Sequence, residues 1–283
     1  MIPRRRLLIN LLCACLVLGV TMTGYAYIPP AEQILGYMIK QFGPDGTFKV
    51  LQKTIIYDPS LEGGIRELDE TLYYRYPDQF RCEVNTPGVE QVRVVGPGGA
   101  ISVTNGKIVA ESENAFDHFK DLFLYRDVGL LLNRLSQTGV NLDVVSLGRH
   151  KNAVAYVIGA NYPDKSLPQV WVEDGTFRPI RYVLRDGGFN DAGLTEIEYA
   201  DYTLLDEDRW YPSRILFYTD GRLARMYVLK THAVNPDVPD QLFDIAYLRT
   251  VYEPIASTQP APSTASDLDE VSKAIRDFGK TFE

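Results

Sequence analysis

The stretch LYYRYPDQFRCEV, Leu72 to Val84, decides the fold because its alternating pattern continues through a turn. In an extended strand, side chains two residues apart share a face. One face of this hairpin therefore collects Leu72, Tyr74, Tyr76, Phe80, Cys82 and Val84. The turn falls at Pro77 to Gln79, since proline presets φ and aspartate bonds the local backbone. The opposite face carries Arg75, Arg81 and Glu83, which we expect to meet water.

The composition is that of an ordinary globular protein. Of the 283 residues, 45% are hydrophobic and 23% are charged, which suits one large domain or two small ones. The formal charge of −8 disfavours nucleic acid and anionic lipid surfaces as main partners. The 18 tyrosines are the one unusual count.

Residues 1–26 are predicted to be a secretory signal peptide. They combine a basic start at Arg4 to Arg6, an apolar stretch and small residues before a cleavage site after Ala26. Two alternatives stay open, a retained membrane anchor over Leu7 to Gly24 and lipidation of Cys15.

Cys82 would be the one cysteine of the mature chain, because the other two lie in the signal peptide. An intramolecular disulfide is then impossible, even in a compartment that permits one. We interpret Cys82 as a small buried apolar residue rather than a reactive thiol.

Alternation with period two recurs along most of the chain, in short runs separated by Gly, Pro, Asn or Asp. The Asn-Gly pair at 105–106 favours a tight hairpin turn. Strands are predicted near 47–58, 67–76, 79–85, 90–96, 100–104, 107–111, 142–149, 152–160, 168–174, 178–185, 194–202, 211–219 and 222–234.

Two segments have a helical period instead. The first is Ala31 to Phe42, and the second is an insertion at 114–139 that forms one kinked helix or two short ones, with Asn114 as its N-cap. The insertion carries a broad apolar face and is suited to cover the sheet as a lid. The residues of that face are Phe116, Phe119, Leu122, Phe123, Leu131, Leu132 and Leu135.

These elements indicate an α+β fold with a large curved antiparallel sheet, a half-open β-barrel whose concave face is covered by helices. A flat sheet of about a dozen strands would be unusual, because strand twist accumulates and makes it curl. Residues 253–266 are rich in Pro, Ser and Thr and are predicted to be a disordered linker. A C-terminal amphipathic helix is predicted over 267–283.

No pattern for catalysis or metal binding is found in the sequence. His118, His150 and His232 are far apart and lack metal-ligand spacing, and there is no nucleophile elbow or phosphate-binding loop. We therefore expect no catalytic residue, no metal, no cofactor and no enzymatic activity. The apolar face either lines a ligand cavity or forms a filled, closed core, and the pattern alone does not separate the two.

The hairpin within ETLYYRYPDQFRCEV resembles the signature hairpin of the LolA/LolB-like lipoprotein carriers. Four other segments resemble the family in the same order, and the likeness covers roughly residues 30–248. These segments are the helix Ala31–Phe42, the hairpin Ser102–Val109, the lid stretch Asp127–Leu135 and the closing segment Val234–Ile245.

The resemblance implies a single half-barrel domain over residues 27–252. Its concave surface would hold acyl chains of a lipoprotein or lipid in transit through the periplasm, as part of outer-membrane lipoprotein sorting. The implied protein is a monomer that exchanges cargo with transfer proteins of the inner and outer membranes. A periplasmic sensor or regulatory domain of the same fold, which recognises a lipid or protein signal, is the alternative.

One position departs from the family. Where the carriers place an arginine before the turn proline to hold the lid shut, this chain has Tyr76, and Arg75 points to the other face. A tyrosine donates one hydrogen bond and lacks the charge of a guanidinium.

Overall fold

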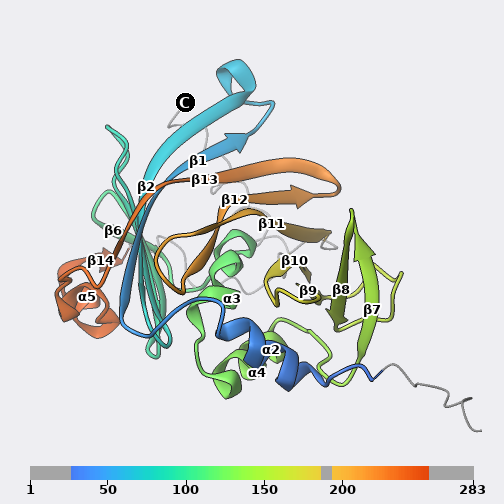
Figure 1. The fold of residues 1–283 in the computed structure, drawn as a ribbon. Coiled ribbons are helices and arrows are strands. Elements are labelled where there is room, and N and C mark those ends of the chain that lie inside the picture. The colour runs from blue at the N-terminus through green and yellow to red at the C-terminus, as the bar shows by residue number, and fades with distance from the viewer. Residues whose placement is uncertain (1–26, 186–192, 255–283) are drawn as a thin grey trace, which may run out of the picture.

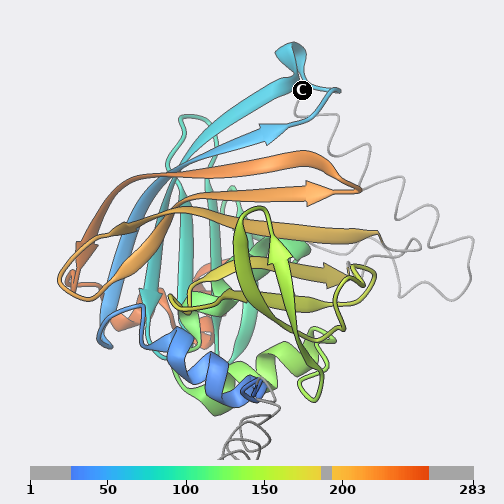
Figure 2. The same ribbon diagram turned by 45° about the vertical axis from the view of Figure 1, so that its right-hand side comes forward.

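The structure is a computed structural model that describes residues 27–185 and 193–254. Within these residues, 14 strands form one sheet in the order β14-β6-β5-β4-β3-β2-β1-β13-β12-β11-β10-β9-β8-β7. Most neighbours are consecutive in the chain and antiparallel, and β1 joins the two halves by pairing with β13. The sheet curls around a concave side without closing, so β14 and β7 are its two edges (Figures 1 and 2).

The strands are β1 (Thr47–Tyr57), β2 (Ile65–Arg75), β3 (Gln79–Val84), β4 (Gln91–Gly96), β5 (Gly99–Thr104), β6 (Lys107–Ala110), β7 (Val145–His150), β8 (Ala153–Ile158), β9 (Gln169–Glu173), β10 (Pro179–Arg185), β11 (Leu194–Leu204), β12 (Trp210–Thr219), β13 (Arg222–Val234) and β14 (Glu253–Pro254). The α-helices are α2 (Ala31–Ile39), α3 (Asp121–Leu124), α4 (Val128–Gln137) and α5 (Ile245–Val251). The 3-10 helices are η1 (Glu62–Gly64), η2 (Ala115–Lys120) and η3 (Asp240–Leu242).

The hairpin of β2 and β3 has the register that the sequence predicts. Leu72 pairs with Cys82 and Tyr74 with Phe80, so the apolar positions lie opposite one another on the concave side. The next strand continues this face, because Val95 of β4 pairs with Phe80. Three neighbouring strands thus contribute alternate residues to one surface.

Helices fill the concave side. The insertion consists of η2, α3 and α4, three short pieces rather than one or two helices, and α2 lies beside α4 (Figures 1 and 2). The Asn114 side chain caps η2 as predicted, and the Asp127 side chain accepts a hydrogen bond from the backbone of Leu130 at the start of α4. The predicted α+β half-open barrel with helices on its concave face is confirmed.

The convex face of β2 to β6 is also covered, which the sequence did not predict. The cover consists of most of the closing segment Val234–Ile245, which includes η3, and of α5, which follows it; both pack outside these strands (Figure 1). Arg81 is buried and donates to the carbonyl of Leu242 at 2.9 Å, and the Arg75 guanidinium lies 4.2 Å from the ring centroid of Phe243. The expectation that this face meets water is wrong, because alternation shows which residues share a face but not what a later segment places over it.

The chain ends are described in part. Glu253 and Pro254, which the sequence assigned to a linker, pair in parallel with Lys107 and Ile108 of β6. The rest of that linker, the predicted C-terminal helix and the predicted signal peptide lie outside the described residues. Among the helices that are described, none has the length and apolar character needed to cross a membrane.

The small core under α5 gives the first prediction. Leu248 of α5 is 3% exposed and packs with Val94 and Ile101, so Leu248→Ala should lower the free energy of unfolding by about 2–5 kcal/mol. Val251 of the same helix is 51% exposed, and Val251→Ala should change it by about 0.5 kcal/mol or less. Urea unfolding of both variants checks this; equal effects would contradict the assignment of α5 to the folded domain.

Candidate functional site

The six predicted concave residues lie where the hairpin pattern placed them. Leu72, Tyr74, Phe80 and Cys82 are buried in the main core, and Tyr76 packs partly buried against it. Val84 is buried too, but it lies at the end of the hairpin beyond that core cluster.

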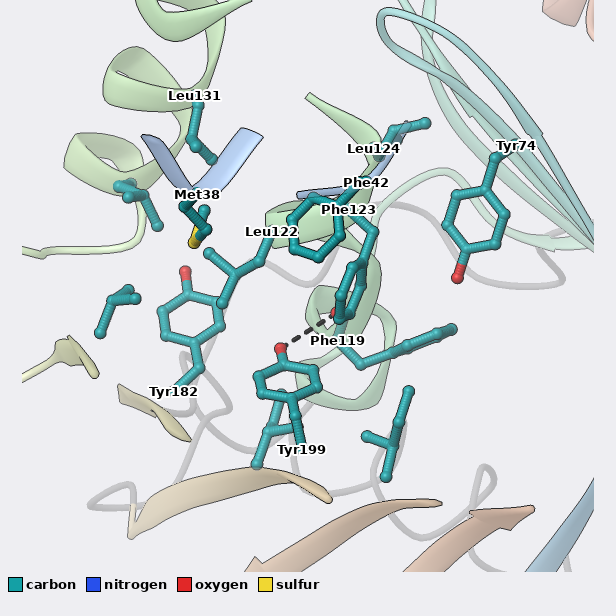
Figure 3. Packing of buried hydrophobic residues seen from close by; sticks show 14 of the residues in the cluster. Met38, Phe42, Tyr74, Phe119, Leu122, Phe123, Leu124, Leu131, Tyr182 and Tyr199 are labelled. Atoms are coloured by element: carbon teal, nitrogen blue, oxygen red, sulfur yellow. Dashed lines mark hydrogen bonds between the residues drawn. The ribbon is translucent and has the colours of Figure 1, made fainter. Parts of the chain in front are cut away.

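The seven predicted lid residues all contact this surface. Phe119, Leu122, Phe123 and Leu131 are buried (Figure 3). Leu135 is buried too, and Phe116 and Leu132 are partly buried against the same cluster. The contacts are largely aromatic: the Phe119 ring lies 4.9 Å from that of Tyr227, and the Phe123 ring 5.2 Å from that of Tyr199, between ring centroids. Sheet and lid therefore form one closed apolar core in this conformation.

Helix α2 belongs to the cover as well, as expected for the helix predicted over Ala31 to Phe42, although its residues were not among the predicted site residues. Its residues Ile34, Leu35 and Met38 are fully buried, and the ring of Phe42 lies 4.9 Å from that of Phe123. The helical period of Ala31 to Phe42 thus predicted which positions of this segment are buried.

A tyrosine from the sheet binds the lid backbone. The Tyr199 hydroxyl of β11 donates to the carbonyl of Phe119 at 3.0 Å in a fully buried site (Figure 3). A second tyrosine hydroxyl, that of Tyr182 in β10, lies 2.7 Å from the Thr138 hydroxyl after α4. Burial raises the pKa of both phenols, so both remain protonated and able to donate.

Tyr76 lies between two arginines. The Arg126 guanidinium, from the α3–α4 connection, is 4.4 Å from its ring centroid, and Arg209 donates to its hydroxyl at 3.3 Å. Both arginines also donate to the carbonyl of Phe42, at 2.7 and 2.9 Å. We call these four residues the arginine clamp. It joins the lid, the end of α2 and the hairpin turn at one point.

A buried charge cluster holds the lid segments together. Lys120 is fully buried and bonds Glu113, while Asp121, also fully buried, accepts from Arg134 Nε at 2.7 Å and lies 2.9 Å from His118 Nδ1. Burial alone would raise the pKa of Asp121, but the charges of Lys120 and Arg134 and the hydrogen bond with His118 hold that pKa well below its usual range. The cluster links η2, α3 and α4 into one unit.

The concave face becomes polar near Val84, at the end of the hairpin that is farthest from the turn. The apolar face predicted for the hairpin therefore ends there. Glu70, one step along from Leu72, accepts from Gln52 at 2.8 Å and from Thr54 at 2.6 Å. Arg93 bridges Glu70 and Asp117, at 3.5 and 3.1 Å. This layer was not predicted from the sequence, although Glu70 occupies an inward position of β2 by the same alternation.

Cys82 lies between the apolar and polar parts, with its sulfur 3.7 Å from Arg93. Burial raises the pKa of the thiol to about 12, so almost none of it is thiolate at neutral pH. It is the free cysteine of the described chain, and it is buried as predicted.

An open hollow of about 450 Å³ lies at the edge of the lid, between α4 and the turns that end β2 and β4. Val95, Ala100 and Tyr125, which contact the main core, are part of its lining, and Asn133 and Arg134 of α4 form another side. This seam is where the cover and the sheet meet solvent.

Metal-binding geometry is absent from residues 27–185 and 193–254, where no three His, Cys, Asp or Glu side chains are grouped to hold an ion. His118 and His150 instead face the carboxylates of Asp121 and Glu198. A hydrogen bond from His150 and the charge of Lys151 lower the pKa of Glu198 to about 2, despite its partial burial.

Comparison with known proteins shows the same fold in solved structures. No protein-family model and no curated protein sequence matches the chain. A LolA superfamily protein from Nitrosomonas europaea superposes with a TM-score of 0.50 at 15% identity, over 78% of this chain and 100% of that one. A domain from Vibrio parahaemolyticus named for outer membrane lipoprotein sorting gives 0.51 at 9% identity, over 77% and 97%. The resemblance predicted from the sequence is thereby confirmed at the level of the fold.

The tyrosine bond to the lid yields a second prediction. Tyr199→Phe leaves the buried carbonyl of Phe119 without its donor, so lid stability should fall by about 1–3 kcal/mol. Amide exchange across residues 115–124 should speed up correspondingly. Tyr73→Phe is the control, since Tyr73 points to the opposite face and contacts Lys49; equal exchange in the two variants would contradict a role for Tyr199 in holding the lid.

The buried charge cluster gives a third prediction, which concerns the dependence of stability on pH. Because the folded pKa of Asp121 is lowered, its stabilisation is complete above the unfolded value, about 3.9, and is lost as the pH falls further. Asp121→Asn should cost about 3–5 kcal/mol near pH 7, since it removes one partner of a buried charge group.

Denaturation of wild type and variant from pH 7 to pH 2.5 tests this directly. The difference in their free energies of unfolding should stay constant down to about pH 4 and shrink below it. A difference that is independent of pH would show that the charge of Asp121 is not what stabilises the lid.

Proposed function

We propose that this protein is a non-enzymatic periplasmic carrier that binds acyl chains of lipoproteins or lipids between its curved sheet and its lid. The observation that carries the proposal is that the concave surface is covered by a separate insertion. Residues 115–137 leave the sheet after β6 and return to it at β7, so they can move without breaking any strand pairing. The fold that the chain shares with lipoprotein-sorting proteins supports the same assignment.

The binding step would be an exchange of apolar contacts. Acyl chains would take the place of the lid side chains against Leu72, Tyr74 and Phe80, while the lid swings outward. The proposed site comprises the six concave hairpin residues and the seven lid residues. The seam beside Tyr125 is the natural place for chains to enter, because it already reaches core residues from solvent.

Free energies favour such an exchange over a permanently open cavity. Acyl burial gains about 0.8 kcal/mol per CH₂. Three long chains would therefore exceed the roughly 18–21 kcal/mol at which measured affinities saturate. A carrier must also release its cargo to transfer proteins of the two membranes. A lid that refills the surface offsets much of the gain, since each buried Leu or Phe returns about 1.5–3 kcal/mol.

Native mass spectrometry of protein purified from the periplasm, with and without a co-expressed lipoprotein, tests the assignment. We expect acylated protein or lipid to co-purify. An unloaded chain bound instead to a stable protein partner would contradict the carrier and support the sensor of the same fold.

A fourth prediction separates a gated site from a filled core. If acyl chains must displace the lid, weakening the lid by about 1 kcal/mol should tighten fatty-acid binding about fivefold, because less free energy is spent on opening. Tyr199→Phe and Thr138→Val each remove one bond between lid and sheet. Titration of a fluorescent fatty acid measures both, with Tyr73→Phe as the unchanged control; weaker or unaltered binding in both variants would sink the gated site.

A further inference from the structure

A second hollow lies at the far ends of the strands, away from the core. It has a volume of about 650 Å³ and a mostly apolar lining, and it lies between the start of β2, the β3–β4 loop and the β5–β6 turn. Leu68, Val89 and Val109 supply apolar surface there, and Val109 is 43% exposed. We call this hollow the rim groove. Its size is that of a ligand-binding cleft.

The rim groove also has a positive edge. Arg66 and Lys107 line it, and among the side chains that the structure describes neither forms an ion pair. The glutamate beside them, Glu67, is already paired with Lys53. An occupant with apolar side chains and nearby acidic groups would therefore suit this surface.

The chain itself passes this point. Glu253 pairs with Lys107 and Pro254 with Ile108, so the polypeptide runs beside two groove residues, Lys107 and Val109, where its described part ends. Residues 255–266 could span up to about 40 Å when extended, which puts the groove well within reach of residues 267–283.

This C-terminal segment has the required chemistry. Residues 267–283 carry an apolar stripe at helical spacing, formed by Leu268, Val271, Ile275 and Phe278. Asp267, Asp269 and Glu270 make the first turn of that segment acidic.

We propose that residues 267–283 dock as an amphipathic helix in the rim groove of their own chain. The stripe covers Leu68, Val89 and Val109, and the acidic first turn lies near Arg66 and Lys107. This docking is independent of the proposed carrier function, since it uses none of the concave or lid residues.

Thiol labelling of the full chain tests the docking. Val109→Cys places a thiol in the groove, and its maleimide labelling is read by peptide mass spectrometry with and without the double substitution Ile275→Asp and Phe278→Asp. We expect labelling about tenfold slower with the native stripe, which corresponds to about 1.4 kcal/mol of docking free energy. Lys273→Asp is the matched control. It changes the net charge by two, as the double substitution does, but it leaves the apolar stripe intact, so the groove thiol should keep its protection.

Three results would overturn the proposal. Equal labelling with and without the native stripe would mean that the segment does not cover the groove. Protection that grows with protein concentration would assign the cover to a second copy. The last control is a thiol introduced by Leu204→Cys in β11, at a position that is 46% exposed. It should label at the same rate with and without the stripe substitutions. If those substitutions speed up labelling at position 204 as well as at 109, the protein has unfolded generally and the segment has not simply undocked.

Discussion

An apolar concave surface cannot face water, and the rest of this structure depends on how that surface is covered. The sheet curls because the twist of many antiparallel strands accumulates, and curling leaves a hollow that the strands cannot fill themselves. The insertion fills it with leucines and phenylalanines, and α2 completes the cover. Since each such side chain contributes about 1.5–3 kcal/mol and a hydrogen bond about 1 kcal/mol, apolar packing holds the lid and polar contacts set its position.

Those polar contacts differ from the ones that the resemblance led us to expect. An arginine before the turn proline would have bound the lid from the hairpin, whereas here Tyr76 stands at that position between Arg126 and Arg209. In this protein the carbonyl of Phe119 in the lid accepts a hydrogen bond from Tyr199 of β11. Three strands, β1, β13 and β12, separate β11 from the β2–β3 hairpin in the sheet. Tyr199 and Tyr202 show one physical use of tyrosine here: each packs an aromatic ring in or against the core and still donates to a backbone carbonyl.

Strand alternation predicted the fold well because period two records burial on one face directly. It placed the strands and the hairpin register, while the helical period placed all seven lid residues, of which Phe119 and Leu131 are typical. Both missed what depends on distant segments. The burial of Arg81 results from the closing segment, about 160 residues later, and the polar layer around Glu70 requires Arg93 and Asp117 to converge from other elements. Local periodicity holds no record of either contact.

The central claim is that acyl chains displace the lid while the sheet stays intact. Hydrogen exchange of the protein with and without a diacylated lipopeptide measures this most directly. We predict that residues 115–137 lose protection on binding while β2 and β3 keep theirs, because the chains replace the lid against the hairpin. Unchanged protection of the lid in a complex that has bound lipopeptide would contradict it, since the cargo would then occupy some other surface.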